Sequence, residues 1–149
     1  MSRVALLDVN VLVALFDPDH VHHDVAHDWF ADNHTAGWAT CPLTENGFIR
    51  VVSNPAYGSL LTRPADLFAR LREFCRRSDH RFWADAISLN DPAVVDPSFI
   101  ATHRSITDVY LLALATKHRG HLATFDRGIP LNAVNGATKR HLTVIAPAE

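Results

Sequence analysis

Val4-Ala5-Leu6-Leu7 is an uninterrupted apolar run that ends at Asp8, and the segment 9–16 follows it directly. An apolar run of this kind is typical of a strand that is buried on both faces of a sheet. The next segment, Val9 to Phe16, predicts a helix that stops before Asp17-Pro18. A strand that leads straight into a helix indicates an α/β domain, and the rest of the chain repeats this pattern.

Further short apolar runs alternate with helical patterns. Strands are predicted at Trp38–Cys41, Arg81–Ala84 (a short edge strand), His121–Phe125 and Leu142–Ile145. Helices are predicted through Val21, Val25, Trp29 and Phe30 to an end near Gly37; from Pro42 to Asn54-Pro55; from Thr62 and Pro64 with Leu67, Phe68, Leu71, Phe74 and Cys75 on the apolar stripe; and from the cap Ser105 to the C-cap Gly120. Strands separated by helices imply right-handed crossovers, so we predict a three-layer α/β/α fold with a mostly parallel central sheet.

The composition indicates one globular domain that covers residues 1–149. Its length suits a single core, and 48% hydrophobic with 20% charged residues is an ordinary balance. No apolar run approaches the ~20 residues of a membrane helix, and the N-terminus lacks a signal-peptide pattern. We therefore expect a cytoplasmic protein with no membrane segment, in which Cys41 and Cys75 are buried thiols.

Four acidic residues stand close to the predicted strand ends. Asp8 ends the first strand and Asp126 ends the strand after the long helix, whereas Glu45 and Asp108 lie in the first turns of helices. In open α/β sheets, ligands bind in the crevice outside the carboxyl ends of the strands. We therefore expect the four carboxylates to converge there.

Converging carboxylates favour a bound cation. Two like charges ~4 Å apart repel by ~4 kcal/mol at an effective dielectric of 20. Mg²⁺, or Mn²⁺, prefers such oxygen ligands, and a bound divalent cation activates water and stabilises charge on a phosphate. With four acids assigned to metal, the other 12 acids stand against 14 Lys and Arg, so the net charge of −2 does not exclude an RNA substrate.

Each acid also has an ordinary structural interpretation. Asp8 can cap the helix that follows it, and Glu45 can simply favour the positive end of its helix. Asp108 completes Ser105-x-x-Asp108, which is close to a capping box, and Asp126 is a common turn residue. Spacing alone leaves both interpretations open.

Four motifs carry a resemblance to a known family. They are Leu6-Leu7-Asp8-Val9-Asn10-Val11-Leu12-Val13-Ala14-Leu15, Thr44-Glu45-x-x-Phe48-x-Arg50, Thr107-Asp108-x-x-Leu111-x-x-Leu114-Ala115 and Leu122-x-Thr124-x-Asp126. Together, in this order, they resemble the motifs of PIN domains, and most closely those of VapC toxins from prokaryotic toxin–antitoxin pairs. The segment from Ser53 to Asp96 carries little of this signature.

The resemblance implies a magnesium-dependent endoribonuclease with Asp8, Glu45, Asp108 and Asp126 as metal-binding and catalytic residues. It also implies that Asn10, Thr107 and Thr124 hydrogen-bond this acidic set and hold it in place. The implied partners are an RNA substrate and a VapB-type antitoxin whose C-terminal segment lies across the acidic cleft. A homodimer is a further expectation from the family.

Two other functions fit parts of the sequence. A haloacid-dehalogenase-like phosphatase also places an Asp after an apolar strand, but its D-x-D motif needs an acid where Asn10 stands. A PIN-like scaffold that binds RNA or protein without cutting would have lost one or more acids, and all four are present. The active ribonuclease is therefore the preferred hypothesis.

The remaining candidate residues have weaker signals. Arg50 can contact a phosphate or pair with an acid, and His103 and Arg104 are candidate RNA contacts. Trp29, Trp38 and Trp83 are expected in the core or at a dimer interface. His20, His22, His23 and His27 lie close in sequence, and the i, i+4 pair His23 and His27 has the spacing of a zinc face. No H-E-x-x-H motif accompanies it, so solvated histidines are the preferred interpretation.

Overall fold

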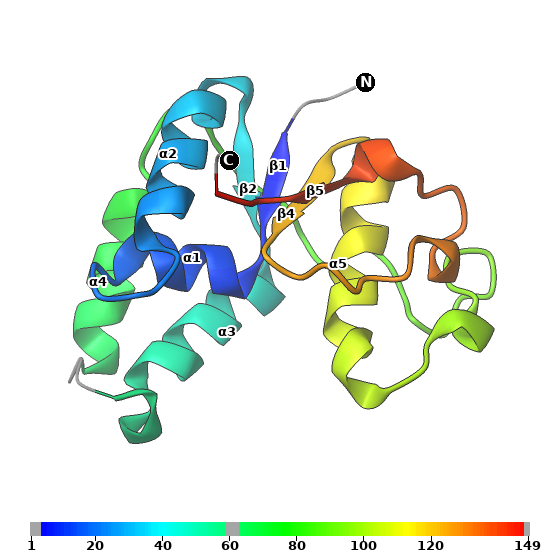
Figure 1. The fold of residues 1–149 in the computed structure, drawn as a ribbon, viewed down its shortest axis with the longest axis horizontal. Helices are drawn as coiled ribbons and strands as arrows, with labels where there is room; N and C mark the ends of the chain where they lie inside the picture. Colours follow the sequence, from blue (N-terminus) through cyan, green and yellow to red (C-terminus); the bar gives the residue numbers. More distant parts are fainter. Residues whose placement is uncertain (1–3, 59–62, 148–149) are drawn as a thin grey trace.

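A central sheet of five parallel strands in the order β3-β2-β1-β4-β5 organises the computed structural model, which describes residues 4–58 and 63–147 (Figure 1). The strands are β1 (Ala5–Leu7), β2 (Trp38–Thr40), β3 (His80–Phe82), β4 (His121–Thr124) and β5 (Leu142–Val144). Every pairing between them is parallel. The predicted parallel sheet is confirmed, and the strand ends differ from the predicted ones by one or two residues.

Helices cover both faces of this sheet. The helices are α1 (Val9–Phe16), α2 (His23–Asn33), α3 (Pro42–Ser53), α4 (Pro64–Phe74) and α5 (Ile106–Lys117). Figure 1 shows α1 to α4 on one side of the strands and α5 on the other. Alternate residues of β1 explain the two layers, because Ala5 and Leu7 pack into the core under α1 to α4 whereas Leu6 packs into the core under α5. The predicted three-layer α/β/α fold is therefore confirmed.

Short 3-10 turns connect these elements. They occupy His34–Ala36, Pro55–Tyr57, Pro97–Phe99, His103–Ser105, Leu131–Ala133 and Lys139–His141. Within residues 4–58 and 63–147, the helices are all too short or too polar to cross a membrane. The predicted start of α4 at Thr62 lies outside the described residues.

Two predicted apolar positions are wrong. Val21 is 87% exposed and precedes α2, because Asp17 accepts hydrogen bonds from the backbone of Asp19 and His20 and folds this segment into a turn. Phe68 is 54% exposed, since α4 buries Leu67 instead.

Gly120 is not the C-cap that the sequence predicts. Helix α5 ends at Lys117, and the left-handed residue after it is Arg119, with φ of 58°. A Cβ atom on Gly120 would lie 2.4 Å from the carbonyl oxygen of Val4 and 2.9 Å from the ring of Trp83. Glycine is needed here because the start of β4 approaches β1 and Trp83 closely.

The predictions for the aromatic and sulfur residues are largely confirmed. Trp38 and Trp83 are buried, whereas Trp29 is half-buried against the same core. Cys41 is buried and Cys75 is half-buried, and both are free thiols.

Candidate functional site

The site lies where the strand order changes direction. From β1 the chain adds β2 and β3 on one side, whereas β4 and β5 lie on the other. A crevice forms outside the carboxyl ends of strands at such a point. Asp8 directly follows β1, and Asp126 lies two residues beyond β4. The backbone N–H of Asp8 donates to Ala123 at 3.0 Å and extends the β1–β4 pairing to this edge.

Asp8 is held on both carboxylate oxygens. Its Oδ1 accepts from the backbone N–H of Val9 at 2.7 Å, and its Oδ2 accepts from the hydroxyl of Thr124 at 2.7 Å. Asp8 therefore does cap α1, as its ordinary interpretation supposes. Its side chain is only 6% exposed, so burial raises the pKa of Asp8, the two hydrogen bonds oppose that rise, and the charge of Asp126 adds to it.

Asp108 and Asp126 form a pair with opposite electrostatic behaviour. Burial raises the pKa of Asp108 to about 7, with further contributions from a hydrogen bond to Asp126 and from the charges of Asp8 and Asp126. The pKa of Asp126 is lowered, chiefly by the backbone N–H of Gly128, which donates to its Oδ1 at 2.8 Å, and then by Asp108. In the metal-free protein the pair thus favours one proton on Asp108, hydrogen-bonded to the Asp126 carboxylate, at pH values below about 7.

Asp108 and Ser105 do not form the capping box that their spacing allows. Ser105 precedes α5 but makes no side-chain hydrogen bond at the start of this helix. Apart from burial, the groups that shift the pKa of Asp108 are Asp126, through a hydrogen bond and its charge, and Asp8, through its charge. This arrangement is typical of a site built for charge rather than for helix capping.

Thr124 connects Asp8 and Asp126, two members of the aspartate cluster, which we define as Asp8, Asp108 and Asp126. Its hydroxyl, which is fully buried, accepts from the backbone N–H of Asp126 at 3.1 Å and from Nδ2 of Asn10 at 3.4 Å while it donates to Asp8. The other amide atom, Oδ1 of Asn10, is buried and has no hydrogen-bond partner among the described residues. Asn10 thus has one unsatisfied hydrogen-bond acceptor, Oδ1, next to the cluster.

Thr107 does not share this arrangement. Its side chain is exposed, and no hydrogen bond joins it to an acidic side chain in the described part of the chain. Thr107 precedes Asp108 on the first turn of α5, where consecutive residues point in different directions.

Glu45 interacts with a different set of residues from the three aspartates. Its Oε2 accepts from the hydroxyl of Thr40 at 2.8 Å, and the same hydroxyl lies 2.8 Å from Nε2 of His80. Burial raises the pKa of the Cys75 thiol to about 11, and the charge of Glu45 adds to this rise. The structure therefore links three of the four predicted acids, Asp108 to Asp126 by a hydrogen bond and Asp8 to both by charge, and turns Glu45 toward Thr40.

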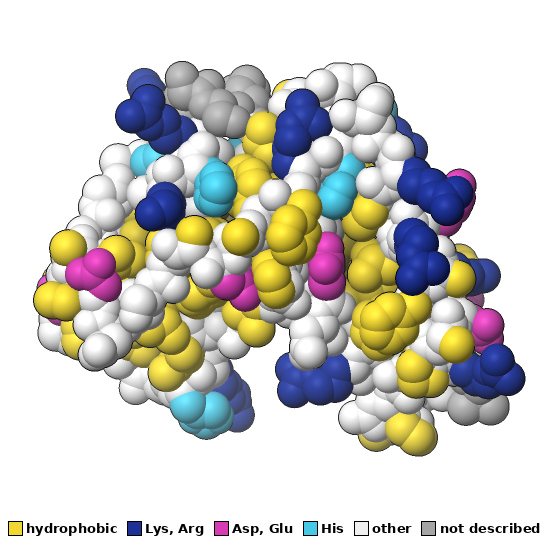
Figure 2. Space-filling view, turned by 180° about the vertical axis from the view of Figure 1, so that it is seen from behind, with side chains coloured by type: hydrophobic (Ala, Val, Ile, Leu, Met, Phe, Trp, Pro, Cys, Tyr) yellow, Lys and Arg dark blue, Asp and Glu magenta, His cyan; other side chains and the backbone are white. Residues whose placement is uncertain are grey.

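The predicted RNA-contact residues lie on the surface. Arg50 is exposed and lines, with Glu45 and Arg72, an open hollow of about 660 Å³. His103 and Arg104 are exposed on the turn before α5. Figure 2 shows acidic side chains in the middle of one face, above a notch with basic side chains on both sides.

The paired histidines of α2 have a structural role. Nδ1 of His23 lies 2.7 Å from the carbonyl oxygen of Ala14, and Nε2 of His27 lies 3.0 Å from that of Leu15. These carbonyls belong to the last turn of α1, which has no intrahelical donors left for them. The pair thus hydrogen-bonds the end of α1 and is not positioned as a zinc face.

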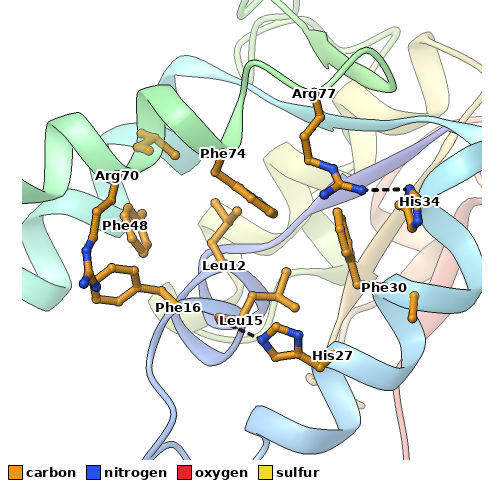
Figure 3. A pocket seen from close by; sticks show the side chains of 12 residues that line it. Leu12, Leu15, Phe16, His27, Phe30, His34, Phe48, Arg70, Phe74 and Arg77 are labelled. Carbon is orange, nitrogen blue, oxygen red and sulfur yellow. Dashed lines mark hydrogen bonds between the residues drawn. The ribbon is translucent and has the colours of Figure 1, made fainter.

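A second concave surface, the apolar groove, lies between α1, α2 and α4. Its volume is about 480 Å³, and its lining includes Leu12, Leu15, Phe16, Phe30, Phe48 and Phe74. Figure 3 shows Arg70 and Arg77 at its rim. Arg70 lies over the ring of Phe16 at 4.7 Å and Arg77 over that of Phe30 at 5.3 Å. Arg77 is also 3.2 Å from Nδ1 of His34.

Thr40, Cys75 and His80 were not found from the sequence. Each is ordinary by itself, and they come from β2, the end of α4 and β3. The only signal in the sequence is a cysteine and a histidine five positions apart in the segment of weak family signature.

Comparison with known proteins identifies relatives of the whole chain. The PIN domain family model matches residues 5–135. Ribonuclease VapC44 of Mycobacterium tuberculosis is 46% identical over 143 residues, which cover 95% of this chain and 99% of the relative. Ribonuclease VapC39 of the same organism is 42% identical over 132 residues (89% and 95% of the two chains), and ribonuclease VapC38 is 45% identical over 126 residues (85% and 87%).

Proposed function

Because this chain belongs to the PIN-domain family, we propose that it is a divalent-metal-dependent endoribonuclease and the toxin of a VapBC-type toxin–antitoxin pair. The relatives are named ribonucleases, which supports RNA as the substrate. The observation that carries the proposal is the aspartate cluster at the switch point of the sheet, in which the Thr124 hydroxyl bonds Asp8 and the backbone of Asp126, and Asp126 bonds Asp108.

The residues of the cluster fit Mg²⁺ or Mn²⁺. Asp8, Asp108 and Asp126 offer only oxygen atoms, which hard divalent cations prefer. Burial, a hydrogen bond to Asp126 and the charges of Asp8 and Asp126 raise the pKa of Asp108 to about 7, and a bound cation would offset the repulsion between these charges. A bound cation would activate water for attack on phosphorus and balance the charge of the phosphate.

The chain's own residues then have separate tasks. Thr124 holds the Asp8 carboxylate by its hydroxyl, and Asn10 offers its free Oδ1 to a water in the cluster. Hydrolysis joins the water oxygen to phosphorus and breaks one bond from phosphorus to a ribose oxygen, and the proton lost by water needs an acceptor. A carboxylate of the cluster, or solvent, receives it, and a proton from solvent completes the hydroxyl on the ribose oxygen that leaves. Glu45 supplies a further carboxylate at the edge of this site. Arg50, His103 and Arg104 contact the RNA backbone.

Cleavage assays test the enzyme. The purified chain should cut single-stranded or loop RNA with Mg²⁺ or Mn²⁺, should stop in excess EDTA, and should not work well with Zn²⁺, because the ligands are oxygens. Asp8→Asn should abolish cutting, whereas Asp28→Asn, an exposed aspartate on α2, should not. Cleavage that persists in EDTA after contaminating nucleases are excluded would refute the proposal.

Growth tests the toxin. Expression of the chain alone should arrest bacterial growth, and Asp8→Asn should relieve the arrest while the protein still accumulates. An equally toxic Asp8→Asn protein would show that the arrest does not come from metal-dependent cutting.

The antitoxin would use the apolar groove as well as the acidic cleft. An amphipathic segment with acidic flanks fits a groove of leucine and phenylalanine side chains that Arg70 and Arg77 border. Arg70→Glu should weaken the complex without changing RNA cleavage, whereas Arg63→Glu, at the exposed start of α4, should leave the complex intact. If the Arg70→Glu protein bound the antitoxin as tightly as the wild type, the antitoxin would have to bind outside the apolar groove.

A further inference from the structure

Three side chains of unlike chemistry meet around Thr40 of β2. A carboxylate oxygen of Glu45, Sγ of Cys75 and a ring nitrogen of His80 all lie within 4.8 Å of one another, and each residue is half-buried. They come from the first turn of α3, the residue that ends α4 and the first residue of β3. Tertiary structure alone assembles this triad.

The triad is held in place by buried hydrogen bonds. Thr40, which is fully buried, lies 2.8 Å from Glu45 and 2.8 Å from His80 and so orients both side chains. The turn between Cys75 and His80 is fixed through Asp79, which accepts from Nε1 of Trp38 at 2.8 Å and pairs with Arg77 at 3.4 Å. These contacts therefore hold Glu45 and His80 in position before any ligand binds.

The donor set differs from that of the aspartate cluster. It offers one oxygen, one sulfur and one nitrogen, which suit Zn²⁺ and similar transition-metal ions rather than Mg²⁺. Zinc lies about 2.0 to 2.3 Å from such ligands, so two ligands of one ion are less than about 4.6 Å apart. Small side-chain rotations bring the triad into that range. The hollow lined by Glu45 and Cys75 leaves room for a water as a fourth ligand.

We propose that Glu45, Cys75 and His80 form a binding site for a thiophilic divalent cation of the Zn²⁺ type, separate from the aspartate cluster. On binding, the Cys75 thiol loses its proton to water and a sulfur–metal bond forms, and no electron transfer is involved. Neutral His80 contributes a ring nitrogen, and Glu45 contributes its carboxylate.

Occupation of this site would inhibit RNA cleavage. This consequence rests on the proposed function, in which Glu45 serves the catalytic site. A Zn²⁺ ion that ligates Glu45 holds that carboxylate beside Thr40 and His80, so that it cannot turn toward the aspartate cluster, and places positive charge beside Arg50 and Arg72. Zinc at this triad is therefore expected to act as an inhibitor.

Cobalt binding tests the site without any RNA. The reduced, metal-free full chain, titrated with Co²⁺, should develop the near-ultraviolet thiolate-to-cobalt absorption to one equivalent, and Zn²⁺ should displace it. Cys75→Ser should abolish the band, His80→Gln should weaken binding by at least about tenfold, and Cys41→Ala, which removes the other thiol, should keep it. No band in the wild-type chain, or a band that survives Cys75→Ser, would overturn the proposal.

Alkylation of the wild-type chain gives an answer that does not depend on any variant folding. Zn²⁺ should slow the labelling of Cys75 by iodoacetamide, located by mass spectrometry, several-fold more than that of Cys41. Equal labelling of Cys75 with and without saturating Zn²⁺ would overturn the site.

Cleavage assays then separate the two proposals. With Mg²⁺ present, added Zn²⁺ should inhibit the wild-type chain, whereas Cys75→Ser should cut at the wild-type rate and resist inhibition. Equal inhibition of both proteins would place the inhibitory zinc elsewhere and overturn the regulatory role. No cleavage with Mg²⁺ in either protein would refute the proposed function. The cobalt titration would still decide, independently of cleavage, whether the triad binds metal.

Discussion

Thr124 donates its hydroxyl proton to Oδ2 of Asp8 at 2.7 Å and so joins the end of β4 to the end of β1 across 116 residues of sequence. Both side chains are buried, and the Thr124 hydroxyl is fully inaccessible to solvent. A buried carboxylate needs such donors to stay charged. This hydrogen bond is therefore the contact through which the sheet sets the position and the charge of the first acid.

Thr124→Val should impair the protein in two ways. Removal of the hydroxyl leaves one oxygen of Asp8 without its donor, which should cost about 1–3 kcal/mol in the free energy of unfolding at pH 8 and raise the pKa of Asp8 further. Cleavage and Mg²⁺ affinity should both fall. Thr124→Ser keeps the hydroxyl and should retain cleavage, and Thr116→Val, whose hydroxyl bonds only to Leu112 within α5, serves as the control. Denaturant unfolding and RNA cleavage measure these effects, and equal cleavage by the Val and Ser variants would contradict the prediction.

Asp108→Asn distinguishes a metal ligand from a helix cap. A lost cap should lower stability by up to ~1 kcal/mol and spare activity. If Asp108 binds metal, its removal relieves repulsion from Asp8 and Asp126, so the metal-free variant should be at least as stable as the wild type at pH 8. Mg²⁺ should then raise its melting temperature less than that of the wild type, and cleavage should fall by orders of magnitude. A variant that melts earlier without metal yet cuts RNA at nearly the wild-type rate would show that Asp108 is a cap.

Metal-free stability should depend on pH through Asp108. Burial and the neighbouring carboxylates raise its folded-state pKa to about 7, above the unfolded value, so folding favours the protonated form. That contribution is fully present below about pH 4 and is lost as pH rises to about 7. The melting temperature of the wild type minus that of Asp108→Asn, both in EDTA, should therefore fall between pH 5 and pH 8. Groups present in both proteins contribute equally, so their effect on the melting temperature cancels in this difference. A difference in melting temperature that stays constant or rises with pH would contradict the raised pKa of Asp108.

Gly120→Ala should destabilise the fold without touching the site. The added Cβ would meet the Val4 carbonyl oxygen at 2.4 Å and the Trp83 ring at 2.9 Å, so backbone or core must shift. We expect a loss of about 1–3 kcal/mol, the usual cost of overpacking. Gly128→Ala, for which the nearest atom lies at 3.5 Å, is the matched control. Denaturant unfolding should separate the two, and equal stability of both variants would show that β4 can move away from β1.

The sequence by itself determined the architecture and the positions of two acids. Apolar runs joined by helices predict a parallel sheet, and the carboxyl ends of parallel strands share one edge. Asp8 and Asp126 follow their strands by at most two residues, so the backbone leaves them little freedom. Thr124 is the last residue of β4 and belongs to the family motif that ends at Asp126. In the structure its buried hydroxyl contacts both Asp8 and Asp126.

Only the tertiary structure decided where the longer and more remote groups point. Glu45 has three side-chain torsions, and its direction is set by the hydroxyl of Thr40 at the end of β2, which in turn meets His80 from β3, 40 residues away in sequence. Val21 fits a helical stripe in sequence, but hydrogen bonds to Asp17 fold its segment into a turn. Periodicity records which residues favour a buried face, whereas a rotamer or a close approach depends on partners that the fold brings from distant segments.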